Sequence, residues 1–243
     1  MSGVWDPMPR TATSNETITR TEAVFVVAYF VAYVGYLFYA PENEALHWLS
    51  LVILPFALLA FLRHRIPGAH ISDLLASAGI RREGLSGGLA IAFIAGIVLT
   101  ALQFRLSRYG PEMTAMVRSG RFFVMYPVAL AAMILMAATT EEVFFRGILQ
   151  TRLSALMRSR VGGILLASLA FGLYHLPYAY AHPRWPSHGD WGAALIAAFG
   201  QGVPGGLILG GQFEISRRNL FSCILLHAMI NAAPATTMIH FGR

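Results

Sequence analysis

Long uninterrupted runs of apolar residues divide the chain into segments of bilayer length, separated by short polar stretches that carry most of the arginines. A helix of about 20 residues crosses the hydrocarbon core of a membrane, because each residue adds about 1.5 Å and the core is about 30 Å thick. The pattern therefore predicts an all-α fold, a polytopic integral membrane helical bundle with about seven transmembrane helices. The predicted spans are residues 23–40, 45–62, 85–104, 122–140, 161–176, 191–211 and 220–240.

The polar stretches predict how these helices connect. Residues 63–84 predict a short amphipathic helix along the membrane interface. Residues 105–121 contain a Gly-Pro pair and predict an exposed loop. Residues 150–160 continue the fourth helix, with apolar positions at helical spacing, before the chain turns near Ser159 into the fifth.

The first 22 residues contain no long apolar run, so we expect them to form a polar N-terminal segment. Residues 23–243 are mostly spans of bilayer length, so we expect them to form a single membrane-embedded domain. The sixth span is rich in glycine and contains Pro204. Two interpretations of it are open: close helix packing through Gly206 and Gly210, or a broken helix that lines a cavity.

Composition agrees with a membrane protein. Hydrophobic residues make up 56% and charged residues only 12% of the chain, whereas a soluble domain is about 25% charged. The net charge of +6 does not indicate a nucleic-acid partner, because the arginines cluster in short loops between apolar runs. Placing the N-terminus in the cytoplasm leaves only six of the 18 arginines outside, which the positive-inside rule favours. Those six are Arg105, Arg108, Arg118, Arg121, Arg184 and Arg243.

An acidic pair follows the fourth apolar run directly. Glu141 and Glu142 stand in an otherwise apolar stretch with Arg146, and ionisable groups at membrane depth are costly and usually functional. Glu142 and Arg146 are at positions i and i+4, the favoured orientation for an ion pair on a helix. Glu141 points about 100° away around the helix, so that pair leaves it without a partner. Glu141 is therefore the main catalytic candidate.

Two other apolar helices carry polar residues at a similar height. His175 ends the fifth run, and His227 and Asn231 share one face of the seventh. Counting residues from the helix ends places Glu141 and these three residues at similar depths in the membrane, so they can meet in one buried site. A carboxylate that is shielded from water in such a site is suited to act as a general base. A zinc site made of Glu141, His175 and His227 is the alternative. Cys223 lies one turn before His227 and is expected to serve packing.

Together these motifs resemble the CAAX-protease and bacteriocin-processing (CPBP/Abi) family of glutamic-type intramembrane proteases, which includes the Ras-converting CAAX endopeptidase. The family pattern E-E-x-x-x-R is found at residues 141–146, F-x-x-x-H at residues 171–175 and H-x-x-x-N at residues 227–231. The motif-bearing core covers residues 124–235. Members of the family mostly have eight helices, one more than the seven runs counted here.

The resemblance implies a membrane endopeptidase in which Glu141 activates water with the help of His175, while His227 and Asn231 hold the oxyanion. Glu142 and Arg146 would then support the helix that presents Glu141. It further implies no cofactor, although older descriptions of the family invoked zinc. Expected partners are a membrane-anchored or lipidated protein or peptide substrate and the lipid bilayer, in a bacterial inner (cytoplasmic) membrane. The other class of function still open is a membrane immunity, binding or transport protein that cleaves nothing. The sequence does not indicate the oligomeric state.

Overall fold

The computed structural model describes residues 20–39, 44–65, 70–183 and 185–239. The predicted polar segment 1–22 lies almost wholly outside these residues. All the regular structure in the described part of the chain is helical, and no strand occurs there. The predicted all-α class is confirmed.

Several helices continue one another through short π-helical stretches, labelled η1 to η4. In chain order the elements are α1 (Arg20–Leu37), α2 (Glu44–Trp48), η1 (Leu49–Ile53), α3 (Leu54–His64), α4 (Ile71–Ser77), α5 (Leu85–Leu106), α6 (Gly110–Arg118), α7 (Arg121–Met133), η2 (Ile134–Ala138), α8 (Thr139–Glu142), η3 (Val143–Gln150), α9 (Thr151–Met157), α10 (Arg160–Ala181), α11 (Trp191–Ala197), η4 (Ala198–Gly202), α12 (Val203–Ile215) and α13 (Leu220–Ala235).

Six helices in the described residues are long and apolar enough to cross a membrane. They match the first six predicted spans, and the seventh corresponds to the shorter apolar helix α13. The fourth is the longest, because α7 to α9 form one helical stretch of 37 residues, Arg121–Met157. The protein is therefore an integral membrane protein built as a polytopic helical bundle. The six are Arg20–Leu37, Ala45–His64, Leu85–Leu106, Arg121–Met157, Arg160–Ala181 and Trp191–Ile215.

The prediction for residues 105–121 is wrong. Most of this segment forms helix α6, which has Pro111 in its first turn, where a proline costs no helical hydrogen bond. Gly110 lies directly against the carbonyl oxygen of Phe104, and Met113 is fully buried. The Gly-Pro pair thus starts a helix instead of ending one. The short helix expected within residues 63–84 is present as α4.

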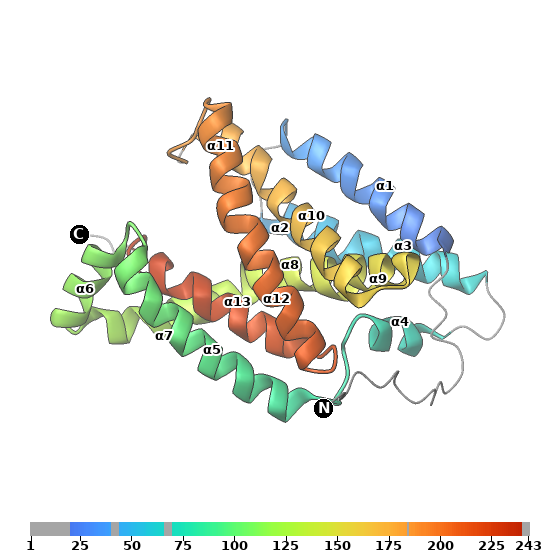
Figure 1. Cartoon of the computed structure of the whole chain (residues 1–243), viewed down its shortest axis with the longest axis horizontal. Helices are drawn as coiled ribbons and strands as arrows, with labels where there is room; N and C mark the ends of the chain where they lie inside the picture. The colour runs from blue at the N-terminus through green and yellow to red at the C-terminus, as the bar shows by residue number, and fades with distance from the viewer. Residues whose placement is uncertain (1–19, 40–43, 66–69, 184, 240–243) are drawn as a thin grey trace, which may run out of the picture.

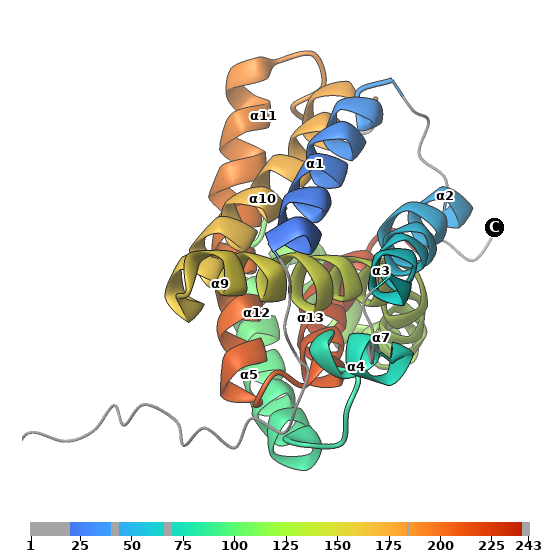
Figure 2. The same cartoon turned by 90° about the vertical axis from the view of Figure 1, so that its right-hand side faces the viewer.

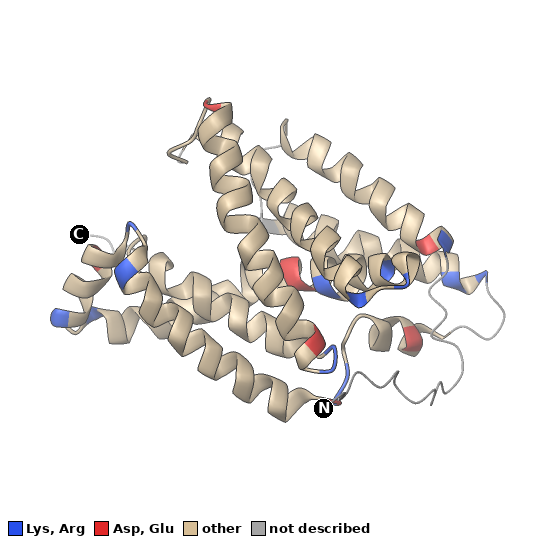
Figure 3. Ribbon diagram, viewed as in Figure 1, with Lys and Arg blue, Asp and Glu red and all other residues tan. Residues whose placement is uncertain are grey.

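Helix α13 lies in the middle of the bundle, between α5 and α7 on one side and α12 on the other. Figures 1 and 2 show α10 passing from α9 up to the hairpin with α11, with α1 alongside it. Figure 3 shows that charged residues gather at helix ends and loops, apart from an acidic patch at α8 with basic residues beside it in the interior. This interior patch is the predicted acidic pair.

Close packing holds the sixth span against the fifth. Gly202 lies against the backbone of Gly172, and a methyl group on Gly206 would come within 2.8 Å of the Cα atom of Ser168. Helical structure is continuous over residues 191–215, so the packing interpretation is confirmed and the helix is not broken. This contact brings the backbone of α12 within reach of Arg146.

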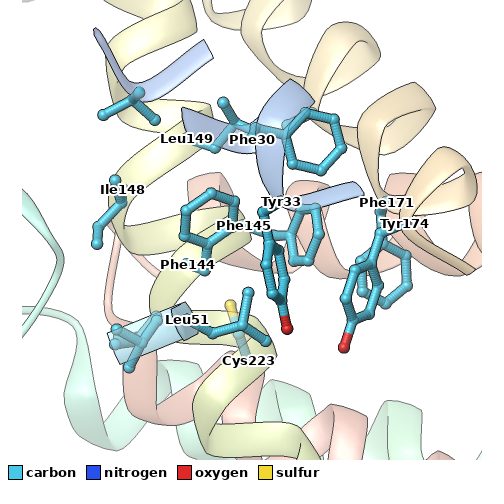
Figure 4. Packing of buried hydrophobic residues seen from close by; sticks show 14 of the residues in the cluster. Phe30, Tyr33, Leu51, Phe144, Phe145, Ile148, Leu149, Phe171, Tyr174 and Cys223 are labelled. Carbon is cyan, nitrogen blue, oxygen red and sulfur yellow. The ribbon is translucent and has the colours of Figure 1, made fainter. Parts of the chain in front are cut away.

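Helices α1, η3 and α10 meet in an aromatic cluster (Figure 4). Phe30 packs on Phe144 with ring centroids 6.2 Å apart, and Phe145 lies edge-on to Phe171 at 5.0 Å and close to Tyr174 at 5.2 Å. Such pairs each add about 0.5–1.5 kcal/mol beyond their buried area. The cluster fixes α10, which carries His175, against the helix that carries the acidic pair.

A second interior ion cluster ties α1 to α3 and α9. Glu22 accepts hydrogen bonds from the Nε atom of Arg63 at 3.1 Å and from the Nη2 atom of Arg152 at 3.3 Å, and all three residues are buried. Glu22 had been assigned to the polar N-terminal segment, but it lies in the first turn of α1. Its partners are distant in sequence, so periodicity alone did not indicate them.

Candidate active site

The acidic pair lies on α8, a single α-helical turn between two π-helical stretches, η2 and η3. A π-helical turn inserts an extra residue into the hydrogen-bond ladder and shifts the faces of the helix that follows it, and such turns are frequent at functional sites. Within α8 itself the usual 100° step between neighbours holds. Glu141 and Glu142 therefore face different surroundings.

Glu142 is completely buried and makes its hydrogen bonds through its Oε1 atom, whereas its Oε2 atom has no hydrogen-bond partner among the described residues. The Nη1 atom of Arg146 donates to this oxygen at 2.8 Å, so the predicted i,i+4 ion pair is present. The Nη2 atom of Arg146 donates to the carbonyl oxygen of Gly206 at 3.3 Å, and the guanidinium lies 4.4 Å from the centroid of the Phe171 ring. The pair thus links the fourth span to the fifth and sixth.

His227 connects the two carboxylates. Its Nδ1 atom lies 2.7 Å from the Oε1 atom of Glu142, which can only accept when ionised, so Nδ1 carries the proton of this hydrogen bond. Its Nε2 atom lies 3.7 Å from the Oε2 atom of Glu141. The contact with Glu142 was not predicted, because the sequence indicates which residues share a helix face but not which oxygen a histidine from another helix will reach.

Glu141 is the carboxylate left free. Its side chain is 12% exposed, and its Oε2 atom makes no hydrogen bond with any described residue. Glu141 lines a cavity of about 160 Å³. This carboxylate can therefore accept a proton from a molecule bound in the cavity.

His175 faces the same cavity from α10. Its Nδ1 atom lies 2.7 Å from the carbonyl oxygen of Phe171, which is an acceptor, so Nδ1 donates and Nε2 keeps its lone pair. A histidine fixed in this tautomer can accept a proton through Nε2. The predicted neighbourhood of Glu141 and His175 is thus present in the structure.

The cavity is also lined by residues that the sequence analysis did not single out. They are His47 on α2, Tyr174 and Tyr178 on α10, and Trp185. The Nε2 atom of His47 lies 2.6 Å from the hydroxyl of Tyr178 and 3.1 Å from that of Tyr174. The only signal in the sequence was a histidine inside the second apolar run.

Asn231 and His227 both lie on α13, and neither is among the described residues that line the cavity. Asn231 is half-buried, four residues after His227. Its role at the oxyanion stays a prediction. Cys223 is fully buried with its Sγ atom 3.6 Å from the carbonyl oxygen of Leu209, which fits the packing interpretation.

Comparison with known families gives one match. Residues 123–233 match the family described as type II CAAX prenyl endopeptidase Rce1-like. This part of the chain is similar to the Rce1-like family. No curated protein and no solved structure matches the chain.

The Rce1-like segment starts in α7 and ends in α13, in close agreement with the motif-bearing core expected over residues 124–235. It contains both carboxylates, His175, His227 and Asn231. His47 lies before this segment, and so do Glu22 and Arg63 of the second ion cluster. The cavity is therefore completed by a helix outside the Rce1-like segment.

The zinc alternative needs three donors in one place. Among the described residues, no three side chains of His, Cys, Asp or Glu come together as a group that could hold a metal ion. Glu141 and His227 are neighbours, but His227 directs its Nδ1 atom to Glu142. Independence from metal stays a prediction, for which a chelation experiment is given below.

Proposed function

We propose that this protein is an intramembrane endopeptidase that hydrolyses a peptide bond with a water molecule activated by Glu141. The observation that carries the proposal is the difference between the two carboxylates. Glu142 is paired with Arg146 and bound to His227 away from the cavity lining, whereas Glu141 lines the cavity, with its Oε2 atom 3.7 Å from the Nε2 atom of His227. Similarity to an Rce1-like, CAAX prenyl endopeptidase family supports proteolysis as the reaction.

In the proposed reaction Glu141 takes a proton from water while the water oxygen bonds to the carbonyl carbon of the substrate. The C–N bond then breaks, and the leaving nitrogen receives a proton from Glu141 or from His175, whose Nε2 atom is free to relay it. By resemblance, His227 and Asn231 stabilise the oxyanion. To do so His227 must offer an N–H from its Nε2 atom, because its Nδ1 atom is directed to Glu142.

We propose a membrane-anchored or lipidated protein or peptide as the substrate, cleaved in CAAX-type processing or in removal of a C-terminal sorting or leader peptide. The site lies within the helical bundle of an integral membrane protein, which fits a substrate that is itself held in the bilayer. We place the protein in a bacterial inner membrane. Neither a nucleic acid nor a metal has a part in this proposal.

Water as the direct nucleophile can be tested with a prenylated CAAX-type peptide and the purified protein in lipid nanodiscs. Mass spectrometry should find one internal cleavage, and reaction in ¹⁸O-labelled water should put one label into the new carboxylate. Adding hydroxylamine should give no hydroxamate, because no acyl-enzyme forms. Hydroxamate formation would point to a covalent intermediate and contradict the proposed use of Glu141.

A further inference from the structure

Helix α13 contains a proline near its end, so one of its carbonyl oxygens lacks the usual helical donor. Pro234 has no N–H and cannot donate to the carbonyl oxygen of Ile230, four residues earlier. The Nε2 atom of Gln103 on α5 donates to this oxygen at 2.9 Å. Gln103 thus supplies, from a neighbouring helix, the hydrogen bond that Pro234 removes.

Two glycines let α5 approach α13 closely enough for this contact. A methyl group on Gly88 would come within 2.7 Å of the Cβ atom of Ser222, and one on Gly96 within 2.5 Å of the Sδ atom of Met229. Gln103 follows Gly96 by two helical turns and therefore lies on the same face of α5. Figure 1 shows α5 running alongside α13.

The side-chain amide of Gln103 is committed to this one carbonyl. It makes no other hydrogen bond with the described residues, and its Oε1 atom is buried without a partner. An unsatisfied buried acceptor is costly, and an apolar side chain would avoid that cost. What a glutamine provides at this position is therefore the Nε2 donor.

The carbonyl that Gln103 binds belongs to the turn of α13 that carries Asn231. Asn231 follows Ile230 directly and precedes Pro234 by three residues. The side chain of His227, one turn earlier, is fixed by its contact with the acidic pair, whereas that of Asn231 makes no hydrogen bond with the described residues. The place of Asn231 is therefore set by the backbone of its turn.

We propose that Gln103 is a positioning residue for Asn231, because it replaces the hydrogen bond lost at Pro234 and so fixes the turn that carries Asn231. The inference rests on the proposed function, which gives Asn231 its role at the oxyanion. Both Gln103 and Pro234 lie outside the Rce1-like segment, residues 123–233. Gln103 acts through the backbone of α13 and is not among the described residues that line the cavity of Glu141.

A cycle of two substitutions tests whether Gln103 compensates for the proline. Gln103→Leu leaves the carbonyl of Ile230 without its donor, and we expect Tm to fall by about 2–10 °C. Pro234→Ala returns a backbone N–H to the helix, so in that background Gln103→Leu should lower Tm by less than half as much. Amide exchange over residues 228–239, measured by mass spectrometry, should rise in Gln103→Leu and return toward the wild type in the double variant. Equal losses of Tm in both backgrounds, or unchanged exchange, would overturn the inference.

Thr100→Val is the matched control. The Oγ1 atom of Thr100, one turn earlier on α5, donates to the carbonyl oxygen of Met229 at 3.3 Å. This carbonyl can still receive the backbone N–H of Ala233, which is not a proline. Thr100→Val should therefore change exchange and Tm less than Gln103→Leu does. An equal or larger effect would show that general packing of α5 on α13 fixes the turn, which contradicts the proposal.

Cleavage of a prenylated CAAX-type peptide separates positioning from stability. Asn231→Ala should lower kcat about 10²–10³-fold, the effect of removing an oxyanion donor. Gln103→Leu, which displaces the same donor, should lower kcat about tenfold with KM within about twofold, and Pro234→Ala should restore most of this loss. In the Asn231→Ala background Gln103→Leu should cause no further loss. A further tenfold loss there would contradict a route through Asn231.

Amide exchange separates the failure of this inference from the failure of the proposed function. If the wild type cleaves nothing while exchange shows the expected coupling of Gln103 and Pro234, the positioning of the turn stands and the endopeptidase proposal fails. If exchange shows no coupling, the inference is contradicted whatever the wild type cleaves.

Discussion

At the scale of single residues, Glu141 and Glu142 are neighbours in sequence with opposite surroundings. Glu142 has no exposed surface and accepts from both Arg146 and His227 through one oxygen. Glu141 lines the cavity, and its Oε2 atom makes no hydrogen bond with the described residues. Glu142 is suited to hold the structure in place, and Glu141 is suited to take a proton.

Removing the charge of Glu142 should therefore destabilise the protein. Glu142→Gln leaves the guanidinium of Arg146 buried without its counter-charge, and breaking a buried pair in this way costs about 3–5 kcal/mol. We expect a clear fall in Tm and in folded yield, measured by thermal unfolding in detergent. Glu141→Gln, the matched neighbour, should keep the Tm of the wild type. Equal Tm values for both variants would contradict the supporting role of Glu142.

Cleavage should also continue without a metal ion. Protein treated with a strong chelator should retain its activity, and metal analysis should find well below one zinc per chain. Loss of activity on chelation with recovery on adding zinc would instead support a site made of Glu141, His175 and His227.

At the scale of helices, glycine contacts set how closely α12 approaches α10. A methyl group on Gly206 would meet the backbone of Ser168 at 2.8 Å, whereas one on Gly211 would meet nothing within 4 Å. Gly206→Ala should therefore lower the free energy of unfolding by about 1–3 kcal/mol through overpacking. Gly211→Ala should leave it unchanged or raise it slightly, since alanine favours helix. Equal effects of the two substitutions on Tm would contradict this packing.

Apolar runs in the sequence were sufficient to predict every long helix and the turn at Ser159, which caps α10. They could not indicate the π-helical stretches around α8, because these change hydrogen bonding without changing polarity. The Gly-Pro pair before α6 was misread because proline is compatible with both a turn and a first helical turn. Spacing also predicted the Glu142–Arg146 pair, which is local, but not His47 or Glu22, whose partners lie far along the chain.

At the scale of the whole molecule, successive spans cross the membrane in opposite directions. The ends of several spans that should lie on the same side are in contact. The Nη2 atom of Arg81 donates to the carbonyl oxygen of Arg217 at 2.7 Å, and Asn219 donates to the carbonyl oxygen of Arg81 at 2.8 Å. These contacts place the start of α5, the end of α12 and the start of α13 on one side. Arg63, Arg146 and Arg152 are buried and do not count toward the charge of that side, but the remaining nine arginines still outnumber the six opposite.

We expect this arginine-rich side to face the cytoplasm. Single cysteines at Arg82 and His188, both exposed, can be introduced in a Cys223→Ala background. An impermeant thiol reagent applied to intact cells should label His188→Cys and leave Arg82→Cys unlabelled until the cells are opened. The reverse pattern would overturn the orientation.

The most direct measurement of the central claim is the cleavage rate of Glu141→Gln in equal amounts of folded, membrane-inserted protein. Removal of a general base lowers the rate by about 10²–10⁴-fold. We predict a loss of this size with Tm and peptide binding maintained, since the Oε2 atom of Glu141 makes no hydrogen bond with the described residues. Cleavage by Glu141→Gln at a rate close to that of the wild type would contradict the account.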